Sequence, residues 1–394
     1  MDVKKSVKAI HTEIKKWRHE LHKIPEIGFE LYKTSQYIKE RLDEMGIEYR
    51  DTAKTGIVAI INVEKPGPTI ALRADMDALP IKEETGLPYA STSGYMHACG
   101  HDAHTSMLLG TAKILSQNIE ILKGKVKLFF QPAEETTGGA KSMIEEGCME
   151  NPNVDAVLGL HINQIFRELG NGQIGIYYGA MMAAADTFVI KVIGKGGHGA
   201  KPHFCVDPIT TAAEMITTLQ RIVSREINPT HPAVITVGKI EGGTTTNVIP
   251  EKVEFEGTVR TLDPDDRIYI EKRIKEMCES IAKANRAEIV IHYDNFYPAV
   301  VNDRGFTRKF VKSAEKIVGK ENIIEIKEPS MGADDMAYFL QEVPGTFFYL
   351  GSHNPKTTRL TYPIHHPKFD IDEDIMWIGS AVFAQTVLDF FNEH

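Results

Sequence analysis

The chain contains few cysteines, and they lie far apart in the sequence. Only Cys99, Cys148, Cys205 and Cys278 occur among 394 residues. Four widely spaced cysteines cannot form a disulfide framework in a chain of this length, so the small disulfide-stapled proteins are excluded. Cys148 and Cys278 are interpreted as ordinary buried thiols, whereas Cys99 lies among histidines and an aspartate that could bind a metal with it.

Positive charge is also in deficit. Lysine and arginine number 45 against 54 aspartates and glutamates, which gives a formal net charge of -9. A chain without a basic excess has no field to attract the phosphate backbone of nucleic acid or an anionic lipid surface. We therefore expect neither a nucleic-acid partner nor a membrane partner.

Long apolar segments are missing as well. Residues 1–8 are charged and contain no apolar core of a secretory signal, and no uninterrupted apolar run looks long enough to span a bilayer. These features predict a cytoplasmic protein. With 42% hydrophobic residues the composition is that of a globular enzyme, and 394 residues exceed the size at which one core keeps growing, so two domains are expected.

The stretch 96–104 is rich in metal-ligating side chains. Its nine residues, MHACGHDAH, hold three histidines, a cysteine and an aspartate around one glycine. In an extended segment Cys99 and His101 would point the same way, so they could bind one ion or bridge two. The alternative is a histidine-rich loop that opens the helix beginning near Thr105, with Asp102 as its N-cap.

Acidic side chains follow two expected strands. Strands are predicted at 56–63 and 69–74, and the second runs into Asp75 and Asp77, which alternation places on one face. A strand at 125–130 is followed by Glu134 and Glu135, adjacent carboxylates that repel each other unless a cation neutralises one of them. The alternatives are aspartates that cap a turn and glutamates in a solvated acidic loop.

Histidines extend this pattern. A strand at 156–160 delivers His161, and a later loop adds His365 and His366. Any one of these could be a hydrogen-bonded structural residue. Repetition at successive strand ends favours a shared site at the carboxyl edge of a sheet, where open α/β folds place their ligands. By contrast, the cluster of His19, His22 and Glu26 has no other ligand chemistry beside it in the sequence and is interpreted as structural.

The order of predicted elements indicates an α/β protein with an insertion. Helices are expected at 5–22 and 31–45, and a further helix runs to about residue 116. Between 185 and 296 the pattern becomes strand 187–194, helix 208–225, strands 233–240 and 253–262, helix 264–285 and strand 288–294. This βαββαβ order is a ferredoxin-like unit. The predicted domains are 1–183 with 298–394, and an inserted domain at 184–297.

Beyond residue 303 the α/β pattern resumes. Helices are expected at 303–318, 335–341 and 372–391, with strands near 323–326 and at 346–350. The first domain is thus discontinuous in sequence, with hinges expected near residues 183 and 298.

Five motifs in this order resemble one enzyme family. They are DMDALP at 75–80, HACGHD at 97–102, QPAEE at 131–135, GGHGA at 196–200 and HHP at 365–367. The chain resembles the metal-dependent amidohydrolase branch of the carboxypeptidase G and aminoacylase superfamily, which includes hippurate hydrolases, N-acetyl-diaminopimelate deacetylases and auxin-conjugate hydrolases. The resemblance covers nearly the whole chain. It implies a dinuclear-metal peptidase-like α/β catalytic domain with an inserted lid and dimerisation domain.

The resemblance also assigns roles within the first domain. It implies that two divalent metal ions, which could be zinc, manganese, cobalt or nickel, are bound by Cys99, His101, Glu135, His161 and His365. It makes Glu134 the general base and acid. Asp77 would orient a histidine ligand from behind. Asp75 stands where other branches carry a ligand histidine, so it would contact a metal or support one.

Three residues of the inserted domain complete the implied site. The glycine-rich segment 194–200 lacks the ending of a phosphate loop, so nucleotide binding is rejected. In relatives the histidine matching His198 polarises the scissile carbonyl and can come from the partner subunit. Asn247 and Arg260 match positions that hold the substrate carboxylate, although either could be an ordinary strand-surface residue. A homodimer or homotetramer formed through this domain is expected.

Two departures from the family pattern bear on the site. His366 stands where relatives often have a small residue, so it competes with His365 for one ligand position, and His365 is preferred. Asp334 replaces a usual glutamate, which would widen the substrate pocket.

The expected reaction is hydrolysis of the amide bond of an N-acyl amino acid. The acyl group could be acetyl, benzoyl or similar. The alternatives are a metallo-carboxypeptidase or dipeptidase acting on short peptides, a thiol amidase that uses Cys99, and a metal-binding module without turnover.

Overall fold

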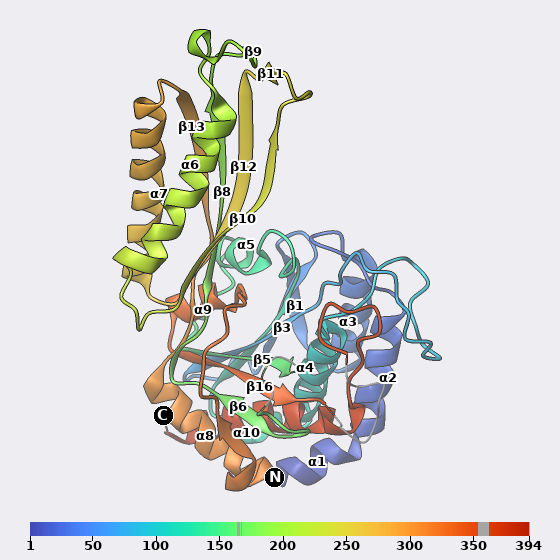
Figure 1. Cartoon of the computed structure of the whole chain (residues 1–394). Coiled ribbons are helices and arrows are strands. Elements are labelled where there is room, and N and C mark those ends of the chain that lie inside the picture. The colour runs from blue at the N-terminus through green and yellow to red at the C-terminus, as the bar shows by residue number, and fades with distance from the viewer. Residues whose placement is uncertain (164–165, 167, 354–361, 394) are drawn as a thin grey trace. The chain divides into compact units, whose positions relative to one another are not determined.

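The computed structural model describes residues 1–163, 166, 168–353 and 362–393. The chain divides into two compact units (Figure 1). Unit 1 consists of Met1–Gly179, Val301–Glu328 and Asp335–His394, and unit 2 of Ala180–Val300 and Pro329–Asp334. The main crossings lie close to the expected hinges, but the short segment 329–334 belongs to unit 2, which no sequence pattern indicated.

Unit 1 is built on a mixed sheet with the strand order β1-β2-β4-β3-β5-β16-β6-β15. The strands are β1 (Glu48–Thr52), β2 (Gly56–Ile61), β3 (Thr69–Asp75), β4 (Lys125–Gln131), β5 (Ala156–Asn163), β6 (Ile174–Ile176), β15 (Ile323–Glu325) and β16 (Gly345–Gly351). The neighbours β4, β3, β5 and β16 run parallel. Their carboxyl ends therefore meet along one edge of the sheet.

Helices cover both faces of this sheet. One face packs against α1 (Val3–Ala9), α2 (His11–His22), α3 (Tyr32–Glu44), α4 (His101–Ser116), α8 (Arg304–Val318) and α10 (Met376–Glu393), and the other against α5 (Gly139–Glu145) and α9 (Met336–Glu342). The alternation of strand side chains explains both layers. Phe348 of β16 contacts Phe310 and Phe383 on the first side, whereas Phe129 of β4 meets Phe339 of α9 on the second.

Three expectations about local structure need correction. The helix expected at 5–22 is two helices, because the chain bends at Ile10 (φ -103°, ψ 8°) while its apolar spacing continues unbroken. Strand β1 was not predicted, since its polar sequence EYRDT is typical of an edge strand with one open side. The helix expected at 208–225 is regular only to Arg221 and ends in a π-helical turn, Ile222–Glu226.

Unit 2 has the predicted ferredoxin-like order. Its elements are β8 (Ala184–Ile193), α6 (Pro208–Arg221), β10 (Ala233–Gly242), β12 (Lys252–Thr261), α7 (Pro264–Ala284) and β13 (Glu288–Tyr297). The sheet order is β10-β12-β8-β13 and all pairings are antiparallel. Its inward side chains, such as Phe188, Phe255 and Ile274, form a separate core beneath the two helices.

Two small ladders complete the described strands. In unit 2, β9 (Gly197–His198) pairs with β11 (Val248–Ile249), and Figure 1 shows this ladder at one end of the larger sheet. Strand β7 (Gly179–Met182) pairs with β14 (Val300–Asn302).

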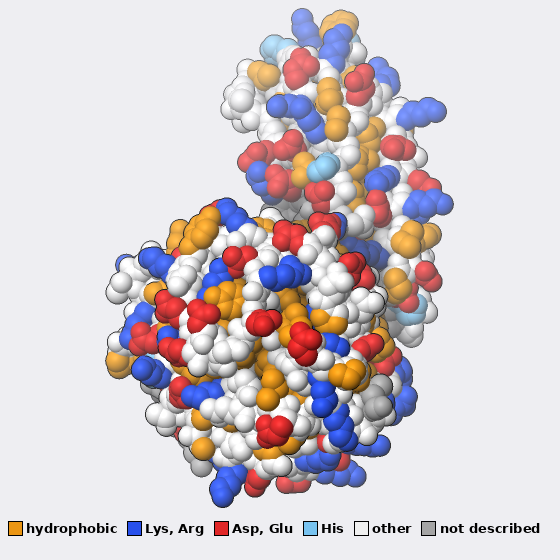
Figure 2. Space-filling model, turned by 180° about the vertical axis from the view of Figure 1, so that it is seen from behind, with side chains coloured by type: hydrophobic (Ala, Val, Ile, Leu, Met, Phe, Trp, Pro, Cys, Tyr) orange, Lys and Arg blue, Asp and Glu red, His pale blue; other side chains and the backbone are white. Residues whose placement is uncertain are grey.

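The helix at the C-terminal end is long and largely apolar. Among the described residues, Glu373–Glu393 could cross a membrane by length and composition alone, although Gln385 and Asp389 interrupt its apolar run. Of its apolar 18-residue stretch, 72% is buried inside the fold, which accounts for the composition. On the face seen in Figure 2, acidic and basic side chains are interspersed over both units.

Candidate metal centre

The segment that carries Cys99 and His101 is a turn rather than an extended strand. Gly100 has φ +89°, a left-handed conformation that costs glycine little, and His101 is the first residue of α4. The cap position is therefore Gly100, so the reading of Asp102 as N-cap is wrong. Because the turn folds back, Cys99 and His101 still present their ligand atoms to the same space, together with His161 of β5.

Two histidines direct the same ring nitrogen toward this space. Nδ1 of His161 lies 2.7 Å from the carbonyl of Ile162, and Nδ1 of His101 lies 3.3 Å from Oδ1 of Asp77. Acceptors at Nδ1 fix a proton there on each ring, so Nε2 is the nitrogen that each ring has left to bind a metal. Nε2 of His161 lies 3.3 Å from Sγ of Cys99. These are the atoms with which neutral imidazoles bind metals.

A strained turn places the two glutamates. β4 ends at Gln131, and Ala133 then adopts φ +57°, a conformation that disfavours residues with a Cβ. The turn brings the backbone N–H of Glu135 to within 3.0 Å of Oδ2 of Asp77. Glu134 is buried, and its carboxylate lies within 4.8 Å of a ring nitrogen of His101 and of the Glu135 carboxylate.

The loop at 362–367 supplies His365, whose backbone is also left-handed (φ +65°). Its Nε2 lies 3.2 Å from Oε1 of Glu135, and its backbone N–H donates to the carbonyl of Ala98. The neighbouring His366 turns away to stack on Tyr362, and its Nδ1 accepts from the backbone of Lys368. The geometry thus favours His365 over His366 as a ligand.

The donor set fits a pair of cations. Two groups of ligand atoms, each within 4.8 Å of one another, share one thiol: Cys99 with His101 and His161, and Cys99 with Glu135 and His365. Nε2 of His101 and Oε1 of Glu135 are buried, yet among the described residues neither makes a hydrogen bond of good geometry, although Oε1 lies 3.2 Å from Nε2 of His365. Buried polar atoms without partners are costly, and a bound cation would satisfy both. Thiolate, imidazole and carboxylate are the ligands that zinc and its neighbours take.

The buried carboxylates around Cys99 and His101 favour the binding of positive charge, either protons or metal ions. Burial, together with the carboxylates of Glu135 and Glu134, raises the pKa of the Cys99 thiol well above its usual range. For His101, burial opposes the charged form, but Asp75 and Asp77 outweigh it and raise its pKa to about 10. Burial and the neighbouring His104 lower the pKa of His161 to about 3, so this ring is neutral. Metal ions would replace protons at the first two groups.

Asp75 is held by other side chains. Its carboxylate accepts from Nη1 of Arg73 at 2.8 Å and lies 2.5 Å from Nδ1 of His104, while it is 3.6 Å from Nε2 of His101. Nε2 of His104 in turn accepts from the backbone N–H of Ile162. Both nitrogens of His104 are thus engaged. We interpret Asp75 and His104 as a brace beneath the site rather than as ligands.

Sequence reasoning missed this brace. His104 falls three residues after His101 on one helix, so helical spacing could have placed both on one face. Arg73 lies within the predicted strand at 69–74, and its guanidinium also binds Gln131 and Asp335. That pairing joins residues 262 positions apart, which no local pattern reveals.

His22 is structural, as expected, although ligand-type side chains do surround it in space. Its Nδ1 lies 2.7 Å from Oδ2 of Asp102, and its Nε2 lies 3.2 Å from the Glu83 carboxylate. Burial opposes its charge, yet Asp102 and Glu83 raise the pKa of His22 to about 9. His97 is also buried, and burial lowers its pKa to about 4.

In unit 2, His198 and Asn247 lie side by side. β9 pairs with β11, and the backbone N–H of Gly199 donates to the carbonyl of Asn247 at 2.8 Å. Both side chains are exposed. Nδ1 of His198 accepts from the backbone of Ala200, which leaves the proton on Nε2 as a hydrogen-bond donor.

Arg260 is not brought to this pair within unit 2. It lies near the far end of β12, where it pairs with Ala185 and Val234. At roughly 3.3 Å per residue, Arg260 is about 25 Å along the strand from Lys252, next to β11. Its guanidinium is half-buried and burial lowers its pKa. Asp334, in the segment 329–334, is buried.

The fold and this donor set are those of a metal-dependent hydrolase. The model of peptidase family M20/M25/M40 matches residues 71–389. The chain belongs to this family, whose members hydrolyse amide bonds.

Similar proteins are known by activity and by structure. The N-acetyl-L-cysteine deacetylase of Bacillus subtilis strain 168 is 45% identical over 358 residues, which are 90% of this chain and 83% of that protein. Thermostable carboxypeptidase 1 of Saccharolobus solfataricus is 38% identical over the full length of both chains. The crystal structure of a dinuclear metal-binding peptidase of family M20 from Bacillus subtilis is 34% identical with a TM-score of 0.84, and covers 98% of this chain and 99% of that one.

Proposed function

We propose that this chain is a dinuclear metal-dependent amidohydrolase that cleaves N-acyl amino acids into a carboxylate and a free amino acid. One observation carries the proposal. Five side chains from four separate segments of unit 1 bring their ligand atoms together: Cys99, His101, Glu135, His161 and His365. The deacetylase and the dinuclear peptidase among the similar proteins support both halves of the proposal.

The five residues would hold two divalent ions, and the cysteine and histidines suit zinc while the carboxylate leaves manganese, cobalt and nickel open. When bound, such ions lower the pKa of a water molecule and stabilise negative charge on the attacked carbonyl oxygen. Asp77 holds the proton on Nδ1 of His101, which keeps the other nitrogen available as a ligand.

Glu134 is the proposed proton carrier. It is buried beside Glu135, at the end of a strained turn that fixes its position. Its carboxylate takes a proton from the attacking water and delivers it to the nitrogen of the departing amine. No other protein group needs to change its protonation state during the reaction.

Unit 2 supplies the proposed substrate contacts. Nε2–H of His198 donates to the substrate carbonyl, and Asn247 and Arg260 bind the substrate carboxylate. Because Arg260 lies far from His198 and Asn247 along β12, one unit 2 cannot bring all three to one small substrate. We therefore propose that the enzyme is a homodimer or a homotetramer assembled through unit 2, and that it acts in the cytoplasm.

The thiol amidase is the weaker alternative. A nucleophilic cysteine needs a lowered pKa and a protonated partner, whereas the pKa of Cys99 is raised and its neighbour His161 is neutral. A carboxypeptidase or dipeptidase activity has more support, because a carboxypeptidase is 38% identical over its full length. It would use the same centre and a substrate with an amino-acid residue as its acyl group.

Chelation combined with a substrate panel tests the proposal. Purified protein is stripped with a chelator, reloaded with zinc, manganese, cobalt or nickel, and assayed on N-acetyl and N-benzoyl amino acids and on dipeptides. We expect turnover to vanish on stripping and to return with a stoichiometry of two ions per chain. Turnover that survives complete stripping but is abolished by thiol alkylation would establish the thiol enzyme instead. Faster hydrolysis of dipeptides than of N-acyl amino acids would establish the peptidase.

A further inference from the structure

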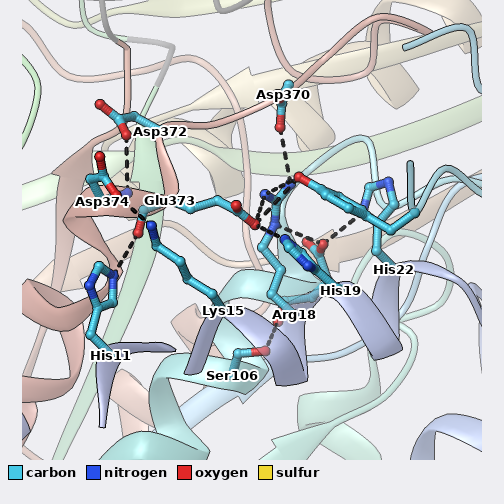
Figure 3. Close-up of polar contacts among 12 residues, drawn as sticks. His11, Lys15, Arg18, His19, His22, Ser106, Asp370, Asp372, Glu373 and Asp374 are labelled. Atoms are coloured by element: carbon cyan, nitrogen blue, oxygen red, sulfur yellow. Dashed lines mark hydrogen bonds and ion pairs between the residues drawn. The ribbon is translucent and has the colours of Figure 1, made fainter. Parts of the chain in front are cut away.

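A buried arginine on α2 lies beneath the proposed metal ligands without touching them. Arg18 is only 1% exposed. Its Nε donates to Oδ2 of Asp102 at 3.1 Å, its Nη1 to Oε1 of Glu373 at 2.7 Å and its Nη2 to Oδ1 of Asp370 at 3.3 Å. All three guanidinium nitrogens thus bind carboxylates. Figure 3 shows Glu373 and Asp370 directed toward Arg18.

The carboxylates come from two segments that continue directly into ligand loops. Asp102 follows Cys99 and His101 at the start of α4. Asp370 and Glu373 follow the loop that carries His365 and precede α10. The two segments touch directly at one further point, where the backbone N–H of His365 donates to the carbonyl of Ala98 at 2.8 Å. Arg18 therefore provides a second connection, through side chains, between the same two segments.

Asp102 is held from a second side as well. His22 lies 2.7 Å from the same carboxylate oxygen that Arg18 binds, and beyond His22 the Glu83 carboxylate accepts from the backbone of Ser91. Ser106 binds the backbone carbonyl of Asp102 at 2.7 Å. The start of α4 is thus fixed by its side chain and by its backbone.

Burial of so many charges is a poor way to gain stability. Each buried charge costs several kcal/mol of desolvation, and well-packed apolar residues of the same volume are often as stable or more stable. A guanidinium is better suited than an ammonium to hold several carboxylates at once, since its donors form a planar, rigid fork. Such an arrangement fits a role in fixing geometry.

We propose that Arg18 is a positioning residue for metal binding, which holds the segment of Cys99 and His101 and the segment of His365 at the spacing that two shared ions require. The inference rests on the proposed function, because it takes these three residues as ligands. Arg18 itself touches neither a ligand side chain nor a reacting atom.

The test measures metal affinity rather than turnover alone. Cobalt(II) is added to metal-free full-length protein in competition with a chromophoric chelator, and bound ions per chain are counted. In Arg18→Lys a single ammonium cannot span Asp102 and Glu373, so we expect the dissociation constant of at least one ion to rise by about 10- to 100-fold. Wild-type affinity for both ions in this variant would overturn the proposal.

A control separates positioning from plain destabilisation. Ile14 is also fully buried on α2 and packs against Gly110 of α4, but it makes none of these polar contacts. Ile14→Ala should lower the melting temperature at least as much as Arg18→Lys, since such truncations cost about 2–5 kcal/mol, and should leave cobalt affinity unchanged. If Ile14→Ala weakens cobalt binding equally, the effect of Arg18 is merely structural and the proposal fails.

A milder variant covers the case in which Arg18→Lys does not fold. Glu373 has a side chain that is 17% exposed, so Glu373→Gln is expected to fold. It loosens only the segment next to His365, and we expect it to weaken one of the two ions while the cobalt–thiolate absorption of Cys99 persists. Two ions held as tightly as in wild type would count against the proposal. Wild-type protein that binds no ions would instead overturn the proposed function itself.

Discussion

The two units of this chain differ in the burial and the spacing of their candidate site residues. In unit 1 they are buried, fixed by hydrogen bonds and gathered at the carboxyl edge of a parallel sheet, as Cys99, His101 and His161 show. In unit 2 they are exposed or half-exposed, and His198 and Arg260 lie at opposite ends of one strand system. The difference teaches that all five proposed metal ligands come from unit 1. The proposed donors of unit 2 would act only on a bound substrate or together with a second subunit.

The largest expected effect lies in unit 1, at the proton carrier. Glu134→Gln keeps the shape and removes the base, so we expect kcat to fall by about 10³-fold. Metal content should stay at two ions per chain, because the amide leaves all five ligands in place. Steady-state kinetics and elemental analysis on the same sample check both statements. Wild-type turnover in Glu134→Gln would show that another residue is the general base.

A loss of metal should follow from a change at the shared thiol. Cys99→Ala removes the one donor common to both ligand groups, so we expect fewer than two ions per chain and at least a 100-fold loss of turnover. Cys205→Ala, in unit 2, is the matched control and should retain both ions. Equal metal content in the two variants would show that unit 1 does not bind ions through Cys99.

A smaller effect is expected from unit 2. His198→Gln removes the proposed donor to the substrate carbonyl, and we expect kcat to fall by about 10- to 100-fold with metal content unchanged. His203→Gln, at another exposed histidine of the same unit, is the control and should be neutral. Loss of metal in His198→Gln would contradict the proposal that unit 1 binds the metal and unit 2 contacts only the substrate.

The smallest effect concerns the free energy of unfolding. It compares the buried pair of His22 and Asp102 in unit 1 with the half-exposed pair of His231 and Asp266 in unit 2. The pKa of His22 is raised from 6.5 to about 9, so its proton stabilises the fold fully below pH 6.5, and this stabilisation is lost as the pH rises through 9. Thermal unfolding of wild type and His22→Gln should therefore differ most at pH 6 and converge above pH 9. His231→Gln breaks the half-exposed pair with Asp266 in unit 2 and should cost less than about 1 kcal/mol at either pH. A pH-independent difference for His22→Gln would contradict the charged pair.

The sequence predicted the candidate site best where ligand-type residues directly follow a predicted strand. Alternation and turn residues indicated β3, β4 and β5, and each of these strands does lead to candidate ligands at one edge. The βαββαβ order of unit 2 could be predicted because the helices and the strands each show their own periodicity of apolar residues. The split between Glu134 as base and Glu135 as ligand came from family resemblance, because adjacent glutamates have the same local signal.

The parts that could not be predicted depend on contacts between distant segments. Arg18 binds residues 84 and 355 positions away, and Arg73 reaches Asp335 across 262 positions. The left-handed turns at Ala133 and His365 occur at residues that rarely adopt that conformation, so propensity argued against them. Both turns lie beside proposed ligands, which is where local preference is expected to yield to function.

Anomalous diffraction from crystals of the full-length protein grown with the physiological metal tests the central claim most directly. The account predicts two peaks per chain about 3.5–4 Å apart, both in unit 1, with Cys99, His101, Glu135, His161 and His365 as the protein ligands. Peaks at another site, or a single ion that leaves His365 and Glu135 unbound, would contradict it.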